Sequence, residues 1–144
     1  MDNEKLKEKV LSIISTAEII EGKQYLIVTV PQNKLYSLAK TLKESTDTFF
    51  DYLFCLSGID WKDSLGVVYH LTSTQYKHSI VLKTSTTNRE NPILDSVSDL
   101  WLTANFHERE VYDLLGIKFK NHPDMRRLFL DNSWGFPLRK DYKD

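Results

Sequence analysis

The residues whose types and spacing suit chemistry gather near the C-terminus, between Asn105 and Tyr142. The charged and titratable ones are Glu108, Arg109, Glu110, Asp113, His122, Arg126, Arg127, Arg139, Lys140 and Asp141. On a helix, Arg109 lies one turn from Asp113, so an intrahelical ion pair is available. Two interpretations stay open: a solvated helix face with weak ordinary pairs, or an interface at which a bidentate arginine meets partner charges away from water.

The C-terminal segment is mildly basic and rich in aromatic side chains. Residues 126–144 hold five basic and three acidic side chains, which leaves a charge of +2. A solvated terminus fits this count, whereas +2 in a chain of net charge −1 is a weak footprint for nucleic acid. The segment also carries Phe129, Trp134, Phe136 and Tyr142 without a period that would turn them toward a core of their own. Aromatic residues interleaved with arginine are typical of interfaces, so we expect this segment to wrap over a partner.

Spacing excludes several motifs of self-contained enzymes. The closest two glycines, Gly58 and Gly66, are eight residues apart, so neither a dinucleotide-binding glycine loop nor a P-loop can form. A zinc-binding HExxH motif starts at His107 and Glu108 but fails at Val111. An enzyme whose acids and histidines converge from distant positions is not excluded, but no sequence feature argues for one.

The composition of the 144-residue chain indicates one soluble domain. Hydrophobic residues make up 41% and charged residues 27%, which supports a packed core and excludes intrinsic disorder. The single cysteine, Cys55, excludes a disulfide framework and a cysteine-ligated cluster, and its apolar surroundings predict an inert packing thiol. The sequence shows neither the apolar run of a signal peptide nor a membrane span. We therefore expect a cytoplasmic protein that holds no metal cluster of its own.

Hydrophobic periodicity predicts the elements that must position these residues. Helices are predicted over 3–15, 33–42 and 96–115, and strands over 25–30, 49–57, 66–74 and 79–84. The mostly apolar run 49–57 predicts a strand buried on both faces. The short connection between the last two strands predicts an antiparallel hairpin. Gly116 stands where the last helix needs a C-terminal cap.

Helices and strands mixed around a central hairpin predict an α+β fold. We expect a two-layer domain in which helices pack on a mixed sheet of about four to five strands. This core spans residues 1–118, and residues 119–144 form an extended segment that binds a partner.

The stretch from Glu108 to Tyr142 resembles the C-terminal motif of the C-type subunit of NADH:quinone oxidoreductase, respiratory complex I. The matching positions are Glu108-Arg109-Glu110, Asp113, Leu114-Leu115, His122, Arg126-Arg127 and Arg139-Lys140-Asp141-Tyr142. The segments FFDYLFCLSGIDW and GVVYHLTS are also similar to that family, so the resemblance covers roughly residues 45–142. Where the family commonly has a histidine before the last proline, this chain has Phe136.

The resemblance implies a structural subunit in the hydrophilic arm of a proton-translocating NADH:quinone oxidoreductase. NADH, FMN, iron–sulfur clusters and quinone would belong to partner subunits, and this chain would hold no cofactor, metal or catalytic residue. It would dock on the quinone-site (D-type) subunit near the iron–sulfur subunits, at the cytoplasmic face of a bacterial inner membrane, without nucleic acid or membrane insertion. The residues expected at the partner interface are Glu108, Arg109, Glu110, Asp113, His122, Arg126, Arg127, Trp134, Arg139, Lys140, Asp141 and Tyr142.

Other functions stay open at this point. Related subunits occur in energy-converting hydrogenases, and the residues do not separate these complexes. A nucleic-acid-binding module that uses the basic tail and a free-standing enzyme are the competing classes.

Overall fold

Helices and strands are interspersed along the part of the chain that the structure describes. This computed structural model describes residues 3–14, 17–21, 25–88, 90, 92–123, 136 and 139. The elements are α1 (Asn3–Ile13), β1 (Glu18–Glu21), β2 (Leu26–Thr29), α2 (Gln32–Glu44), β3 (Tyr52–Asp60), β4 (Leu65–Ser73), β5 (His78–Thr86), β6 (Ile93–Asp95), α3 (Leu102–Leu115) and β7 (Lys118–Lys120). Among the described helices, none combines the length and the apolar character that crossing a membrane requires.

Five of the strands form one mixed sheet in the order β1-β2-β5-β4-β3. β4 and β5 form the predicted antiparallel hairpin, β3 pairs antiparallel with β4, and β2 runs parallel to β5. β6 and β7 pair in parallel as a separate two-stranded ribbon. The prediction of an α+β fold with a mixed sheet packed by helices is confirmed.

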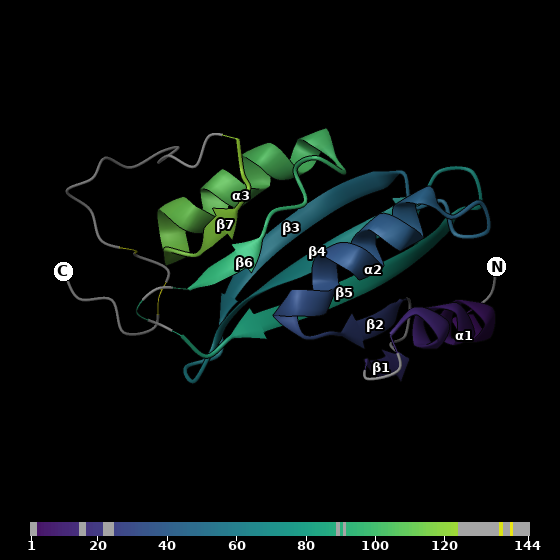
Figure 1. The fold of residues 1–144 in the computed structure, drawn as a ribbon, viewed down its shortest axis with the longest axis horizontal. Helices are drawn as coiled ribbons and strands as arrows, with labels where there is room; N and C mark the ends of the chain where they lie inside the picture. The colour runs from purple at the N-terminus through teal and green to yellow at the C-terminus, as the bar shows by residue number, and fades with distance from the viewer. Residues whose placement is uncertain are drawn as a thin grey trace.

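The alternation of side chains shows which face of the sheet the helices cover. Leu56, Tyr69 and Leu82 are cross-strand neighbours on β3, β4 and β5, and each is only 1% exposed. On the opposite face, His70 and Lys83 remain half-buried. Figure 1 shows α2 lying across the sheet on the viewer's side, with α3 near one end of the molecule and α1 near the other. The core therefore lies between one layer of helices and one face of the sheet.

The environment of β3 differs from the prediction. Tyr52 and Phe54 are 45% and 40% exposed, while Leu53 and Leu56 on the same strand are buried. The register of β3 against β4 shifts between Leu53 and Cys55, which marks a bulge in the strand. The expectation of burial on both faces is wrong, because β3 is an edge strand whose second face carries aromatic side chains without a covering helix.

The last helix begins six residues later than predicted, at Leu102 instead of residue 96. Residues 96–101 form a turn in which the N–H groups of Leu100 and Trp101 donate to the carbonyl of Val97, at 3.0 and 3.1 Å. The apolar side chains of this turn are buried, and their spacing along the sequence matches that of the buried face of a helix. Periodicity therefore predicts a helix where the structure has a turn.

Three short strands, β1, β6 and β7, are absent from the sequence-based prediction. β7 crosses the predicted boundary between residues 118 and 119, and Phe119 within it is only 3% exposed. The described fold thus continues past the predicted end of the core.

Candidate partner interface

Helix α3 carries four of the predicted interface residues, and tight packing fixes the helix on the sheet. Trp101, directly before the helix, donates its indole N–H to the carbonyl of Phe50 at 3.0 Å. Near the other end, Gly58 of β3 leaves room for the helix, since a Cβ there would lie 2.4 Å from Leu115 Cδ1. The sheet therefore determines where the side chains of α3 point.

Glu108 lies on the inner side of α3 and is fully buried. Its Oε1 accepts a hydrogen bond from the Ser96 hydroxyl at 2.6 Å, and its Oε2 accepts one from the N–H of Val97 at 2.9 Å. Burial raises the pKa of Glu108 to about 7 despite the lowering effect of these hydrogen bonds, and the nearby charge of Asp99 adds to the increase. Glu108 thus ties the turn before α3 to the middle of the helix.

His122 approaches the same carboxyl group from the residues that follow β7. Its side chain is buried, and its Nε2 lies 3.9 Å from Glu108 Oε1. The same nitrogen lies 3.2 Å from the carbonyl of Asn105, a hydrogen bond that requires a proton on Nε2. His122 therefore connects the exit from β7 to α3.

Phe136 and Arg139 lie against the C-terminal end of α3. Arg139 Nε donates to the carbonyl of Leu115 at 2.6 Å, and its guanidinium carbon lies 5.1 Å from the centre of the Phe136 ring. The Phe136 ring centre is in turn 6.1 Å from that of Tyr112. Carbonyls in the last turn of a helix have no partner within the helix, and the helix dipole favours a cation there. Arg139 therefore supplies what this helix end lacks.

Gly116 makes this contact possible. Its φ of 79° lies in the left-handed region, and its N–H donates to the carbonyl of Tyr112 at 2.9 Å. A Cβ at this position would lie 2.7 Å from Phe136 Cδ2 and 2.8 Å from Arg139 Nη2. The prediction of Gly116 as the helix cap is confirmed, and the same residue leaves space for the returning chain.

The structure describes half of the twelve predicted interface residues, and all of these lie on α3 or against it. Glu108 and Asp113 are fully buried inside the chain, whereas Arg109, Glu110 and Arg139 are half-buried. The other six lie outside the described residues: Arg126, Arg127, Trp134, Lys140, Asp141 and Tyr142. Contact of the twelve with a partner stays a prediction.

Two positions differ from the expected environment. Phe136 packs on Tyr112 of its own chain, although the sequence around it shows no hydrophobic periodicity. A single side chain can pack on the end of a helix without a periodic pattern around it. Glu108 is part of the chain's own core and not of a solvated helix face. Its spacing carries the signal: Ala104, Glu108, Val111 and Leu115 recur at intervals typical of one helix face, and all are buried. No sequence pattern identifies Ser96 as its partner.

A groove of about 220 Å³ runs beside the outer side of α3. Its lining residues are Ser57, Gly58, Glu110, Val111, Leu114 and Leu115. Glu110 is thus the predicted interface residue that lines a hollow surface between α3 and β3.

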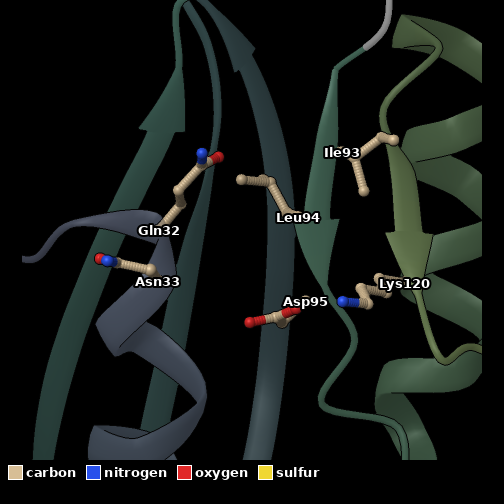
Figure 2. Close-up of a pocket in the computed structure, with 6 residues that line it drawn as sticks. All are labelled: Gln32, Asn33, Ile93, Leu94, Asp95 and Lys120. Carbon is tan, nitrogen blue, oxygen red and sulfur yellow. The ribbon is translucent and has the colours of Figure 1, made fainter.

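A second pocket, of about 270 Å³, lies between the start of α2 and the β6–β7 ribbon (Figure 2). Its lining residues are Gln32, Asn33, Ile93, Leu94, Asp95 and Lys120. Asp95 and Lys120 face each other as cross-strand neighbours, so the pocket combines both signs of charge. None of the six predicted interface residues that the structure describes lines it.

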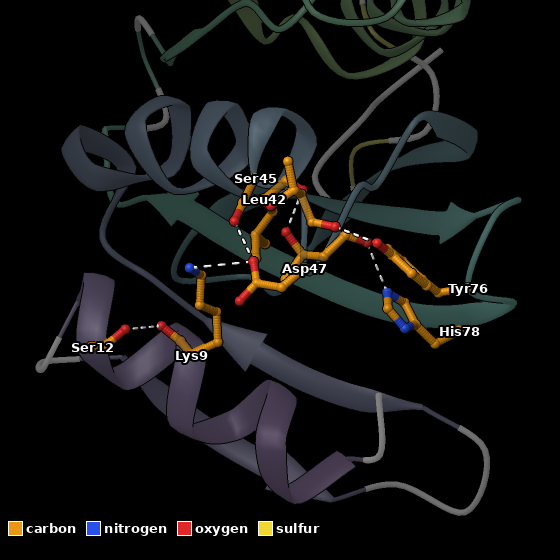
Figure 3. A network of polar contacts seen from close by, with 9 residues as sticks. Lys9, Ser12, Leu42, Ser45, Asp47, Tyr76 and His78 are labelled. Atoms are coloured by element: carbon orange, nitrogen blue, oxygen red, sulfur yellow. Dashed lines mark hydrogen bonds and ion pairs between the residues drawn. The ribbon is translucent and has the colours of Figure 1, made fainter.

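A polar network connects α1 and the β4–β5 hairpin to the turn after α2 (Figure 3). Lys9 Nζ lies 3.4 Å from Asp47 Oδ1, and the hydroxyl of Tyr76 donates to the carbonyl of Thr46. In the same turn, the carbonyl oxygen of Thr48 lies 2.9 Å from His78 Nε2. These contacts fix the far end of the domain.

Comparison with known protein families gives a match over most of the chain. Residues 28–144 match the family model of the respiratory-chain NADH dehydrogenase 30 Kd subunit. The chain is 52% identical over 119 residues to the C/D-type subunit of NADH-quinone oxidoreductase from Phocaeicola vulgatus. This alignment covers 81% of this chain and 22% of that protein. It is 46% identical over 110 residues to the C-type subunit of NADH-quinone oxidoreductase from Chloroherpeton thalassium, with 74% and 45% covered. The chain therefore spans less than half of the length of these relatives.

A solved structure has the same fold. The trypsin-resistant fragment (1–134) of Nqo5 superimposes with a TM-score of 0.72 at 28% sequence identity. The superposition covers 86% of this chain and 99% of that fragment.

Proposed function

The chain belongs to the family of the 30 Kd subunit of respiratory-chain NADH dehydrogenase, and from this premise we propose that it is a non-catalytic structural subunit of a proton-translocating NADH:quinone oxidoreductase. It docks on the quinone-site (D-type) subunit, near the iron–sulfur subunits of the hydrophilic arm. NADH, FMN, the iron–sulfur clusters and quinone are bound by these partners. The assembly places the chain peripherally, at the cytoplasmic face of a bacterial inner membrane.

The observation that carries this proposal is the attachment of the C-terminal segment to α3 at two places. His122 contacts the middle of the helix through the carbonyl of Asn105, and Arg139 contacts its end through the carbonyl of Leu115. His122 and Arg139 are therefore already held against one helix before the chain meets a partner. Docking then costs less ordering entropy, which is the advantage of a preorganised interface.

The relatives support the D-type subunit as the neighbour. The Phocaeicola vulgatus protein joins the C-type and D-type subunits in its name, and this chain matches 22% of its length. Two subunits that share one polypeptide in a relative are good candidates for direct contact as separate chains. Half-buried Arg109 and Glu110 on α3 offer both signs of charge to such a partner.

Affinity purification of the tagged chain in mild detergent tests the proposal. We expect recovery of a large assembly that contains the quinone-site subunit. Arg139→Ala should reduce that recovery and NADH:quinone turnover together, because it removes both the anchor on α3 and a cation of the docking segment. Loss of one partner of a desolvated charged contact costs about 2–5 kcal/mol.

Lys40→Ala, at an exposed position of α2, is the matched control and should leave both readouts unchanged. Circular dichroism of the isolated chain verifies that each variant stays folded. Recovery of the wild-type chain without a quinone-site subunit would refute the proposal. Mass spectrometry of the recovered proteins separates this assembly from an energy-converting hydrogenase-type complex.

A further inference from the structure

A buried carboxyl group joins three separate segments of the chain. Glu108 belongs to α3, Ser96 and Val97 to the turn before it, and His122 to the residues after β7. The side chains of Glu108 and His122 are both 0% exposed. A change in the charge of the Glu108 carboxyl group therefore alters the contacts of all three segments.

The other titratable groups near Glu108 disfavour its charge. Asp99 of the preceding turn raises the pKa of Glu108 through its own negative charge, and Asp99 itself accepts a hydrogen bond from Tyr36 of α2 at 2.5 Å. From the sheet, the buried phenol of Tyr69 on β4 has its pKa raised by burial first, and then by Glu108 and by Asp95 of β6. Burial and the charge of Asp99 therefore make the neutral carboxyl group the easier form to bury.

The two protonation states of Glu108 differ in what they demand from the surrounding segments. A neutral carboxyl group needs one donor and one acceptor: its carbonyl oxygen accepts from the Val97 N–H, and its O–H can donate to the Ser96 hydroxyl oxygen, 2.6 Å away. A carboxylate buried at the same place also needs a counter-charge, and the nearest described candidate is the His122 ring, at 3.9 Å. Opening of the cluster gives the carboxylate access to water, so ionisation favours the open arrangement.

We propose that Glu108 is a protonation-dependent latch that holds the Ser96–Val97 turn and His122 against α3, and so positions the start of the C-terminal segment. The role in docking rests on the proposed function, whereas the latch itself is a property of the isolated chain. Glu108 is a positioning residue that acts on the segment through the packed His122 ring, whose Nε2 lies 3.9 Å from Glu108 Oε1 and is hydrogen-bonded to the carbonyl of Asn105.

The direction of the pH effect follows from the two states. When the latch is closed the pKa of Glu108 is about 7, and when it is open the carboxyl group has its ordinary pKa of 4.5. The closed state binds the proton more tightly, so opening becomes easier as pH rises from 4.5 to 7 and levels off above 7. Between pH 5 and pH 8 the opening equilibrium should rise on the order of a hundredfold.

Amide hydrogen exchange of the full chain at pH 5 to 8, corrected for intrinsic rates, tests the latch. The N–H groups of Val97 and His122 should lose protection on the order of a hundredfold over this range. They should also be more than about tenfold less protected than β4 amides, which marks a local opening. Glu108→Gln has no titratable group: its amide oxygen can accept from the Val97 N–H and its amide N–H can donate to the Ser96 hydroxyl oxygen, so its protection should not vary with pH. Glu110→Gln, on the outer side of the same helix, should behave like wild type.

Four results would overturn the latch. Protection of Val97 and His122 that equals that of β4 would show exchange only through global unfolding. Protection independent of pH in wild type, or pH dependence retained in Glu108→Gln, would remove the role of the carboxyl group. If Glu108→Gln does not fold, carboxyl-carbon nuclear magnetic resonance of the wild-type chain decides: a Glu108 midpoint near 7 that coincides with the exchange midpoint supports the latch, and an ordinary midpoint overturns it. No partner is present, so these results leave the docking proposal untouched, and failed co-purification leaves the latch untouched.

Discussion

Glu108 is a fully buried carboxyl group on α3, and this burial raises its pKa. A carboxyl group with no exposed surface loses its hydration, and here two donors and a nearby histidine replace only part of it. The folded chain therefore prefers the protonated form at pH values where an exposed glutamate is charged. The stability of the domain and the pH of its surroundings are linked through this one side chain.

We predict that the stability gap between Glu108→Gln and wild type depends on pH. The pKa of Glu108 is raised to about 7 in the folded chain, so its stabilising contribution is complete below pH 4.5 and is lost as pH rises through 7. The free energy of unfolding of both proteins is measured with urea at pH 5 and pH 8. Relative to wild type, the variant should become more stable by about 2–3 kcal/mol between pH 5 and pH 8. Comparison with the variant is necessary because burial lowers the pKa of His78, which favours the folded state at higher pH.

Glu110→Gln is the control for this measurement. Its side chain is half-buried on the same helix, and we expect its stability gap to wild type to be the same at both pH values. An unchanged gap for Glu108→Gln would contradict the raised pKa.

At this scale the sequence predicts the type of interaction better than the partner. The sequence places Arg139 among the residues expected at a partner interface, and the contact that the structure shows is with the carbonyl of Leu115, 24 residues earlier in the chain. That contact depends on the path of the chain after β7, which no local pattern encodes. The burial of Glu108, in contrast, can be inferred from its position in the apolar stripe of α3.

Among the elements, α3 depends on β3 for its position. Gly58 on β3 is half-buried, and the side chains of Val111 and Leu115 occupy the space where its Cβ would be. Glycine at this position lets the helix approach the strand closely. The same approach sets where the end of α3 meets Arg139, so the positions of β3, α3 and Arg139 depend on one another.

We predict that Gly58→Ala destabilises the domain by about 1–3 kcal/mol, because an added methyl group overpacks the contact. Its Cβ would lie 2.4 Å from Leu115 Cδ1 and 2.9 Å from Val111 Cγ1, so the helix must shift. Urea unfolding measures the loss. Ser57→Ala, at the exposed neighbouring position, should stay within about 0.5 kcal/mol of wild type. Equal stability of Gly58→Ala and wild type would show that the helix is not closely packed there.

Long elements with a clear period are the predictable ones. α1, α2 and the β4–β5 hairpin follow from local spacing, since each carries several turns or pairs of the same pattern. β6 and β7 contain three residues each, and their pairing joins segments more than 20 residues apart. Their stability comes from that distant contact, which explains why periodicity does not reveal them.

For the whole molecule, the order of the strands is what sequence reasoning leaves undetermined. β2 lies beside β5 and not beside β3, which is the next strand along the chain. The chain therefore passes through α2, β3 and β4 before β5 pairs in parallel with β2. The function class, in contrast, follows from the C-terminal motif, and family membership confirms that resemblance. Of the closing residues of this motif, the structure describes Arg139 and shows it held at the end of α3.

The central claim is that α3 holds the C-terminal segment ready for a partner subunit. Its most direct test replaces Phe136 by a photoreactive phenylalanine derivative in the tagged full chain, with the same replacement at exposed Tyr76 on the β4–β5 hairpin as control. After irradiation of the purified assembly, mass spectrometry identifies the cross-linked proteins. We predict cross-links from position 136 to the quinone-site subunit and none to that subunit from position 76. Cross-links within the chain to Tyr112 are expected in either case, whereas the absence of any cross-link from position 136 to the quinone-site subunit would contradict the claim.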